Sequence, residues 1–262
     1  MVFIPLGPVA TIGRRGFSSR GGHSRQWIQR HLHDRYVLKA QAQDYRSRAA
    51  FKLKELDDKC SIFRRNQLVL DLGCHPGGFS QVALERTMAS SSKSRVIGVD
   101  LQYMDSLGDK FTFLQGDVTD PAIFDRIIQE IGPDRRADVV MSDMAPAMVG
   151  IKGDDHLNIV ELCMHASHLM ERTLKIGGWF MCKMFQGPAT ANFKLYMQTR
   201  FKVVKGLKPK ASRRESPEMY LVGHNFIGRE SIASESPTNF WNYPWKEGLE
   251  LDLHYTPRDK IR

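Results

Sequence analysis

The sequence has few cysteines and no long apolar run. Its four cysteines, Cys60, Cys74, Cys163 and Cys182, lie far apart and in no Cys-x-x-Cys spacing. This scatter argues against a disulfide framework and a zinc site, so we expect free thiols and no structural metal. No apolar run approaches the roughly 18 residues that cross a bilayer, and we expect no membrane span.

Acidic residues are missing from two segments. Residues 1–33 hold five arginines and no Asp or Glu, and residues 200–214 hold seven cations and again no acid. Because the net charge of the whole chain is +9, the remaining residues are close to neutral. The positive charge therefore belongs to two separate segments, which predicts anionic partners or a targeting signal there.

The first 23 residues have the composition of a mitochondrial transit peptide, with Arg and Ser but no acid. We expect this leader to direct the chain to the mitochondrial matrix; the alternative is a disordered basic tail. Residues 24–227 are long enough for one α/β domain with a substantial core. Residues 228–262 form an extension of unknown role, which contains Phe240, Trp241, Tyr243 and Trp245 among prolines.

A glycine-rich turn follows a short apolar run in the segment QLVLDLGCHPGGFS, residues 67–80. Gly73, Gly77 and Gly78 lack a Cβ, so a ligand can approach the backbone closely. A strand, a tight turn and a helix start form the usual nucleotide-binding corner of α/β proteins. His75 stands where a dinucleotide fingerprint needs its second glycine, which argues against NAD. The alternative is a plain tight connection.

Acids close three predicted strands. Asp100, Asp117 and Asp143 follow apolar runs at residues 95–99, 111–114 and 138–142. Ligands of open α/β sheets bind outside the carboxyl ends of the strands. These acids therefore predict a ligand crevice at that edge, with Asp100 placed to accept hydrogen bonds from ribose hydroxyls.

Lys183 interrupts the predicted strand 179–185, which is otherwise almost wholly apolar. A charged lysine is costly to bury, so it must reach a cleft, pair with carboxylates or lose its proton. The alternative is a lysine whose stem lies along the strand and whose amine reaches water. Lys52, in a predicted helix at residues 47–59, is by itself more typical of a surface charge.

Seven segments in order resemble the FtsJ/RrmJ-type ribosomal RNA 2′-O-ribose methyltransferases, in their mitochondrial large-subunit branch. They are RSRAAFKLKEL, DLGCHPGGFSQ, VIGVDLQYMD, FLQGDVTD, VVMSDMAPAMVG, MCKMFQG and SRRESPEMYLV, within residues 24–226. Where bacterial members have AAPGGW, this chain has CHPGGF, so Phe79 replaces Trp and His75 is a departure.

The resemblance implies a Rossmann-like α/β fold that binds S-adenosylmethionine (SAM). Its seven-stranded, mostly parallel sheet would have an antiparallel last strand and helices on both faces. The family's catalytic set falls on Lys52, Asp143, Lys183 and Glu218, with Lys183 as proton acceptor. Its SAM contacts fall on Gly77, Phe79, Asp100, Asp117 and Asp143, beside Gly73 and Gly78 of the turn.

The expected activity is SAM-dependent 2′-O-methylation of a uridine in mitochondrial large-subunit rRNA. The expected partners are that rRNA and the large subunit or its assembly intermediate. Cations near the predicted site would hold phosphates rather than read bases. They are Arg46, Arg48, Lys208, Lys210, Arg213 and Arg214. The alternatives are methylation of a tRNA anticodon loop, an rRNA-binding assembly factor whose catalysis is dispensable, and, for the cations, a solvated charged face.

Overall fold

The structure is a computed structural model that describes residues 34–88, 93–146 and 152–228. The predicted leader at residues 1–23, the predicted helical residues 24–33 and all of the C-terminal extension except Gly228 lie outside the described residues. The described residues include every segment of the family resemblance apart from residues 147–150 within VVMSDMAPAMVG.

A seven-stranded sheet with the order β3-β2-β1-β4-β5-β7-β6 organises the molecule. The strands are β1 (Leu68–Leu72), β2 (Arg95–Asp100), β3 (Phe111–Gln115), β4 (Ala137–Ser142), β5 (Leu174–Phe185), β6 (Phe201–Leu207) and β7 (Glu218–Phe226). The first five strands pair in parallel, whereas β7 runs antiparallel to both β5 and β6. The prediction of a mostly parallel Rossmann-like sheet with an antiparallel last strand is confirmed.

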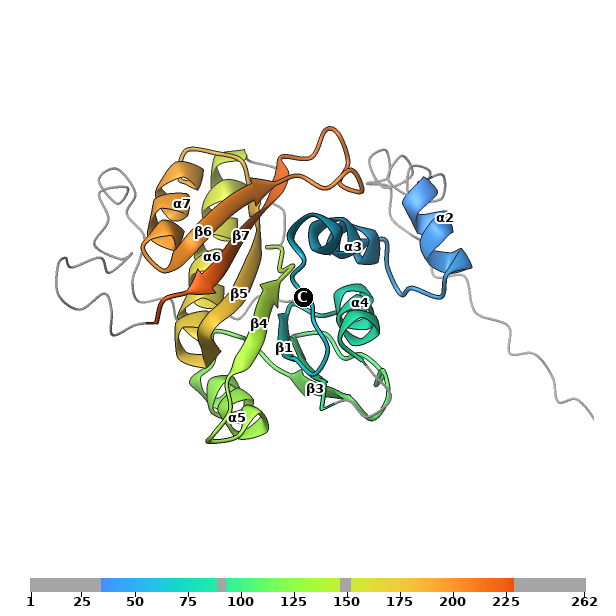
Figure 1. The fold of residues 1–262 in the computed structure, drawn as a ribbon. Coiled ribbons are helices and arrows are strands. Elements are labelled where there is room, and N and C mark those ends of the chain that lie inside the picture. Colours follow the sequence, from blue (N-terminus) through green and yellow to red (C-terminus); the bar gives the residue numbers. More distant parts are fainter. Residues whose placement is uncertain (1–33, 89–92, 147–151, 229–262) are drawn as a thin grey trace, which may run out of the picture.

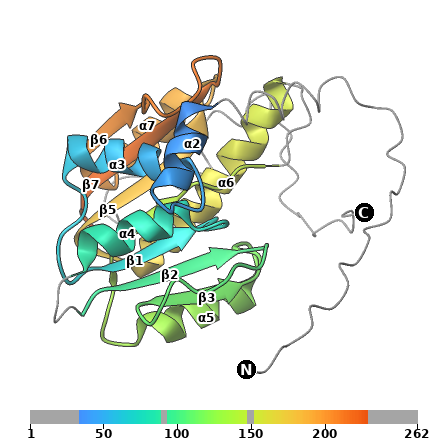
Figure 2. The ribbon, with the colours of Figure 1, turned by 90° about the vertical axis from the view of Figure 1, so that its right-hand side faces the viewer.

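Helices cover both faces of this sheet (Figures 1 and 2). On one face lie α2 (Arg35–Ala42), α3 (Ala49–Cys60) and α4 (Gly78–Thr87), with α2 against α3. On the other lie α5 (Pro121–Ile131), α6 (Lys152–Thr173) and α7 (Thr190–Gln198). A parallel sheet needs this double cover because its central strands are apolar on both sides, and all five residues of β1 are buried.

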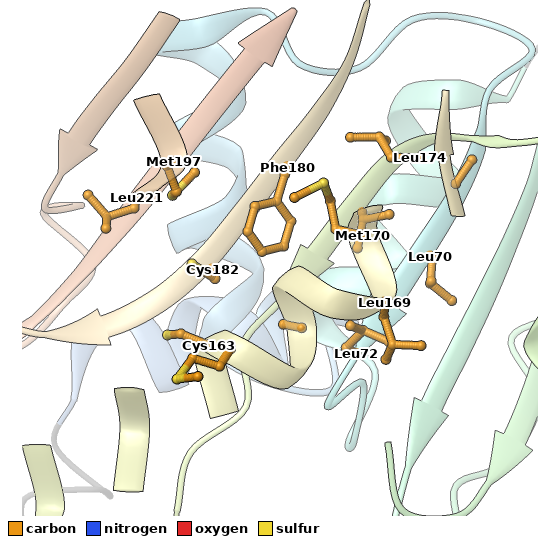
Figure 3. Packing of buried hydrophobic residues seen from close by; sticks show 14 of the residues in the cluster. Leu70, Leu72, Cys163, Leu169, Met170, Leu174, Phe180, Cys182, Met197 and Leu221 are labelled. Carbon is orange, nitrogen blue, oxygen red and sulfur yellow. The ribbon is translucent and has the colours of Figure 1, made fainter. Parts of the chain in front are cut away.

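The larger hydrophobic core lies between the sheet and α5, α6 and α7. Figure 3 shows Phe180 of β5 at its centre, with Met170 of α6 nearby and Cys182 facing Cys163. A second core joins the opposite face of the sheet to α3 and α4, with Leu53, Phe79 and Tyr220 among its buried members. Neighbouring positions of one strand thus serve two cores, as the alternation of side chains requires.

Local sequence sets several element ends. The Asp120 carboxylate accepts a hydrogen bond from the Ala122 amide at 2.8 Å, and Pro121 occupies the first turn of α5. Gly132 ends this helix with a φ of 90°. Ser61 ends α3 in the left-handed region, with a φ of 55°.

The structure lengthens three predicted strands. The sequence pattern predicts them at residues 179–185, 201–204 and 218–222. In the structure, β5 begins at Leu174, β6 ends at Leu207 and β7 ends at Phe226. The sequence pattern predicts the preceding helix at about residues 154–174, with Gly177 and Gly178 after its end. Helix α6 does end at Thr173, but the chain passes directly into β5, so both glycines lie within a strand. The register between β4 and β5 shifts at this point, because the two glycines lie within the strand.

Candidate active site

The turn between β1 and α4 needs glycine for conformation and for space. Gly73 and Gly77 have φ values of 77° and 119°, which side chains rarely adopt. A Cβ on Gly73 would lie 2.6 Å from Cγ of Met144, and one on Gly77 would lie 3.0 Å from Met104 and Arg46. The glycines therefore allow Met144, Met104 and Arg46 to pack closely against the turn. Gly78, the first residue of α4, is buried against Ser47.

The acids predicted to line the crevice lie at the ends of β2 and β3. The Asp100 carboxylate accepts hydrogen bonds from the backbone amides of His75 and Gln102, both at 2.8 Å. It thereby fixes the glycine-rich turn to the end of β2, while the His75 side chain is exposed. Asp117 accepts from the amide and hydroxyl of Thr119 at 2.8 Å. Both carboxylates are only partly buried, so each keeps accessible oxygen for a ligand.

Lys183 of β5 lies against Asp143, the residue that follows β4. The lysine Nζ is 3.2 Å from Asp143 Oδ1 and also donates to the Asp143 carbonyl. Burial acts to raise the pKa of Asp143, but the charges of Lys183 and Lys52 outweigh it and lower that pKa. The carboxylate is therefore ionised beside two cations. This pairing explains how an apolar strand accommodates Lys183, whose side chain is 8% exposed.

Lys52 of α3 pairs with Glu218, the first residue of β7. Its Nζ lies 2.7 and 2.8 Å from the two carboxylate oxygens, and the Ser212 hydroxyl donates to the same carboxylate at 2.7 Å. The pair is largely shielded, with side-chain exposures of 12% and 11%. The four predicted catalytic residues thus form two adjacent lysine–carboxylate pairs at one edge of the sheet.

Tyr220 connects these pairs, and sequence reasoning missed it. It stands opposite Lys183 in the β5–β7 ladder, and its hydroxyl donates to Asp143 Oδ1 at 2.6 Å. Burial, followed by the charges of Asp143 and Glu218, raises the pKa of Tyr220 well above its usual value, so the phenol remains a donor. Its ring also lies 6.1 Å from that of Phe79, centre to centre. The sequence did contain a signal for Tyr220: it follows Glu218 by two positions, so the two side chains lie on the same face of β7.

Asp71 of β1 is a second residue that sequence reasoning missed. It is fully buried beneath the turn and accepts a 2.6 Å hydrogen bond from the Ser80 hydroxyl. Burial raises the pKa of this carboxyl to about 7, and the charges of Asp143 and Asp100 act in the same direction. An acid inside an apolar strand was the signal.

The predicted phosphate-binding cations border the site but have different surroundings. Arg46 donates to the carbonyls of Asp105 and Ser106 at 2.7 and 3.2 Å, and Arg48 pairs with Asp34 and the Ala211 carbonyl. Lys208 donates to two carbonyls of the β6–β7 loop at 2.7 and 3.2 Å, from Ser216 and Arg214.

The remaining cations of this group lie in the same loop. Arg213 is 3.8 Å from Asp34, while Lys210 and Arg214 are exposed. Contact of any of these six residues with RNA stays a prediction. One cation of the basic segment points elsewhere, because Arg200 is buried and pairs with Glu171 at 2.6 Å on the α6 side of the sheet.

Two further findings concern the described residues as a whole. They contain no group of three or more His, Cys, Asp or Glu side chains arranged to hold a metal ion. Among the helices of residues 34–88, 93–146 and 152–228, none is both long and apolar enough to cross a membrane.

The sheet order, the glycine turn after β1 and the carboxylates at the strand ends define a Rossmann-like α/β protein with a ligand crevice at its carboxyl edge. Residues 45–226 match the model of one family, described as the FtsJ-like methyltransferases. The chain belongs to this family.

Close relatives carry one shared name. "Ribosomal RNA large subunit methyltransferase E" of Alcanivorax borkumensis is 43% identical over 206 residues, which cover 79% of this chain and 97% of the relative. The protein of that name from Ehrlichia chaffeensis is 42% identical over 203 residues, which cover 78% and 93%. A crystal structure of a Plasmodium falciparum protein assigned as a ribosomal RNA methyltransferase superposes with a TM-score of 0.64 at 40% identity, covering 71% of this chain and all of that one.

Proposed function

We propose that this protein transfers a methyl group from SAM to the 2′-hydroxyl of a uridine in mitochondrial large-subunit rRNA. The family and the names of its relatives support methyl transfer to large-subunit rRNA. The observation that carries the chemistry is the pair of lysine–carboxylate contacts, Lys183–Asp143 and Lys52–Glu218, beside the glycine turn. The composition of residues 1–23 supports the mitochondrial location.

The crevice at the carboxyl edge suits SAM. SAM carries its methyl group on a positively charged sulfur, which leaves as a neutral thioether when the methyl group is transferred. Gly73 and Gly77 give the turn after β1 its left-handed backbone conformation, and Asp100 and Asp117 present carboxylates at the ends of adjacent strands. Leu101 and Tyr103, which follow Asp100, are 60% and 66% exposed and offer apolar surface to a flat heterocycle.

The four polar residues divide the work at the ribose. A neutral hydroxyl is a poor nucleophile, so a base must take its proton as the oxygen attacks. The proposed acceptor is Lys183 in its neutral amine form, which becomes an ammonium as it takes the proton. Its Nζ lies near the end of β5, beside Asp143. Asp143, held by Tyr220, orients that amine, while Lys52 and Glu218 orient the hydroxyl. Alignment of oxygen and methyl group supplies the remaining acceleration.

Substitution of the proposed base tests this assignment. We expect Lys183→Ala to lower the rate of methyl transfer to large-subunit rRNA by at least about 100-fold, with SAM affinity retained in calorimetry. Lys175→Ala, at the exposed opposite end of the same strand, is the control. Wild-type product formation by Lys183→Ala would refute the base assignment.

The substrate is tested by mapping 2′-O-methyl groups in organellar RNA after the protein is removed. The expected result is the loss of one uridine methylation from large-subunit rRNA. Loss of a methyl group from a tRNA anticodon loop would show that the substrate is tRNA instead. Restored subunit assembly by Lys183→Ala would show that binding is the essential role. Comparing the location of the full chain with that of a chain lacking residues 1–23 tests the leader.

A further inference from the structure

A shallow pocket lies on the α3 face of the sheet, near the middle of β5. Its volume is about 270 Å³, and its lining includes Trp179 of β5, Lys205 of β6, His224 of β7 and Cys60 at the end of α3. Arg64, just after α3, also lines it. None of these residues belongs to the catalytic set.

Two rings form an aromatic wall in this pocket. Trp179 and His224 are directly opposite in the β5–β7 ladder, and their ring centres are 3.8 Å apart with planes inclined by 16°. Both side chains are only partly buried. A flat stacked pair at an open pocket provides a surface on which another flat ring stacks favourably.

The pocket is electropositive. Arg64 and Lys205 are exposed, and neither side chain forms a hydrogen bond or ion pair with another described residue. No carboxylate lies among the residues that line the pocket. Burial, and then the charges of Arg64 and Lys205, lower the pKa of His224, as expected where two cations oppose a third.

The pocket and the catalytic residues share one face of the sheet. Trp179 precedes Lys183 by four positions on β5, which corresponds to roughly 13 Å along a strand. The cross-strand rows are Trp179–His224–Val203, then Met181–Val222–Lys205, then Lys183–Tyr220–Leu207. Edge strand β6 thus runs from the pocket to the row of Lys183. This distance is short enough for a few nucleotides of one extended RNA strand to span it.

We infer that this pocket holds a second, unpaired nucleotide of the RNA substrate. Its base stacks on the Trp179–His224 wall, and its phosphate contacts Arg64 and Lys205. Aromatic stacking with neighbouring cations is the chemistry by which proteins hold single-stranded RNA without reading its sequence. The inference rests on the proposed function, because it assumes that the substrate is RNA.

The experiment uses the full chain with the double variant Arg64→Ala/Lys205→Ala. Both side chains are exposed, so the fold should persist. With a short single-stranded oligouridylate as probe, we expect the slope of log affinity against log salt to become shallower by about 0.7, for the one phosphate that the two side chains hold. We expect Trp179→Leu to weaken binding about tenfold, and Trp179→Phe to restore most of it. The control is Lys202→Ala, which removes an exposed lysine from β6, the strand of Lys205.

A footprint on Cys60 separates this inference from the proposed function. Of the four cysteines, three are buried and Cys60 is partly exposed. The oligouridylate should protect Cys60 from alkylation in the wild type and fail to do so in the double variant, whether or not methyl transfer occurs. In methyl transfer to rRNA, the double variant should have a KM at least about tenfold above that of the wild type, with kcat and SAM affinity unchanged.

Two results would overturn the inference. One is unprotected Cys60 with an unchanged salt slope in the double variant. The other is a double variant that binds RNA as tightly as the wild type but no longer binds the large-subunit particle. This result would mean that the pocket holds a ribosomal protein. If the wild type methylates no RNA while the footprint is present, only the proposed activity fails.

Discussion

Tyr220 holds the carboxylate that pairs with the proposed proton acceptor, through a single hydroxyl. Its bond to Asp143 helps to keep that carboxylate ionised and aimed at Lys183. We expect Tyr220→Phe to lower kcat about tenfold, since a hydrogen bond to a charged group contributes about 1.5–3 kcal/mol, with KM for RNA unchanged. Steady-state methyl transfer measures both constants. Tyr196→Phe, which removes a bond to Glu171 on the other face, should leave kcat unaltered; equal effects of the two variants would contradict the role of Tyr220.

Asp71 makes stability depend on pH. Burial raises the pKa of its carboxyl to about 7 in the folded protein, against about 3.9 in the unfolded chain. The folded state therefore holds the proton more tightly, and the resulting stabilisation is complete below about pH 4 and is lost as the pH rises through 7. Asp71→Asn cannot ionise. Its free energy of unfolding relative to wild type should rise by up to roughly 4 kcal/mol across this range.

Urea unfolding at several pH values measures this difference. Asp58→Asn, at an exposed carboxylate, is the control and should give a nearly constant difference from wild type. A constant difference for Asp71→Asn as well would show that Asp71 is ionised in the fold throughout.

The sequence identifies residues better than it identifies their bonds. Lys183 can be singled out because charge within an apolar strand is costly, and Asp100 because it closes a strand. The contact of Ser212 with Glu218 gave no signal, since a serine in a loop has many possible partners. Arg48 resembles a phosphate ligand in sequence, yet it pairs with Asp34, because only the folded chain brings α2 beside α3.

At the scale of elements, the Lys52–Glu218 pair fastens α3 to the start of β7. Removing one partner of a shielded pair leaves the other charge without compensation, so we expect Lys52→Met or Glu218→Gln alone to cost about 3 kcal/mol of unfolding free energy. The double variant should be more stable than the sum of the two predicts, by at least about 1 kcal/mol. Urea unfolding of all four proteins measures the coupling.

The surface pair Arg86–Asp58 provides a matched cycle. Its side chains are 34% and 63% exposed, so its coupling should lie below about 1 kcal/mol. Equal coupling in the two cycles would mean that burial adds nothing to the contact between α3 and β7.

The order of the elements along the chain was predictable, and their limits less so. Apolar runs ending in acids locate β2, β3 and β4 within a residue or two. The start of β5 was harder, because Gly177 and Gly178 are as typical of the chain just after a helix as of an irregular strand. Pairing with β4 and β7 decides the matter, and neither partner is near in sequence.

At the scale of the whole molecule, one strand supports both cores. Phe180 of β5 has no exposed surface and stacks near Phe201, 6.2 Å away between ring centres. Phe180→Ala should lower the free energy of unfolding by about 3–5 kcal/mol. Phe124→Ala, at a partly buried ring beneath Arg172, should cost less. Thermal and urea unfolding measure both; equal losses would show that the larger core is loosely packed around β5.

The arrangement of strands in the sheet is the part that residue patterns leave open. Hydrophobic alternation does not say that β7 lies between β5 and β6, because any strand of suitable polarity fits there. The family resemblance predicted only that the last strand runs antiparallel, and the pairing of β7 with both neighbours confirms that direction.

The place of β7 has a consequence for how the protein comes into being. The ribosome delivers β5 and β6 before β7, yet in the finished sheet β6 is bonded to β7 alone. Until residue 226 has emerged from the ribosome, the growing chain therefore has an unpaired edge on β5, and β6 has no strand to pair with. Strand β7 also carries Glu218, Tyr220 and His224. A chain that ends before β7 therefore lacks both a complete catalytic site and a complete sheet, and it exposes the unpaired edge of β5.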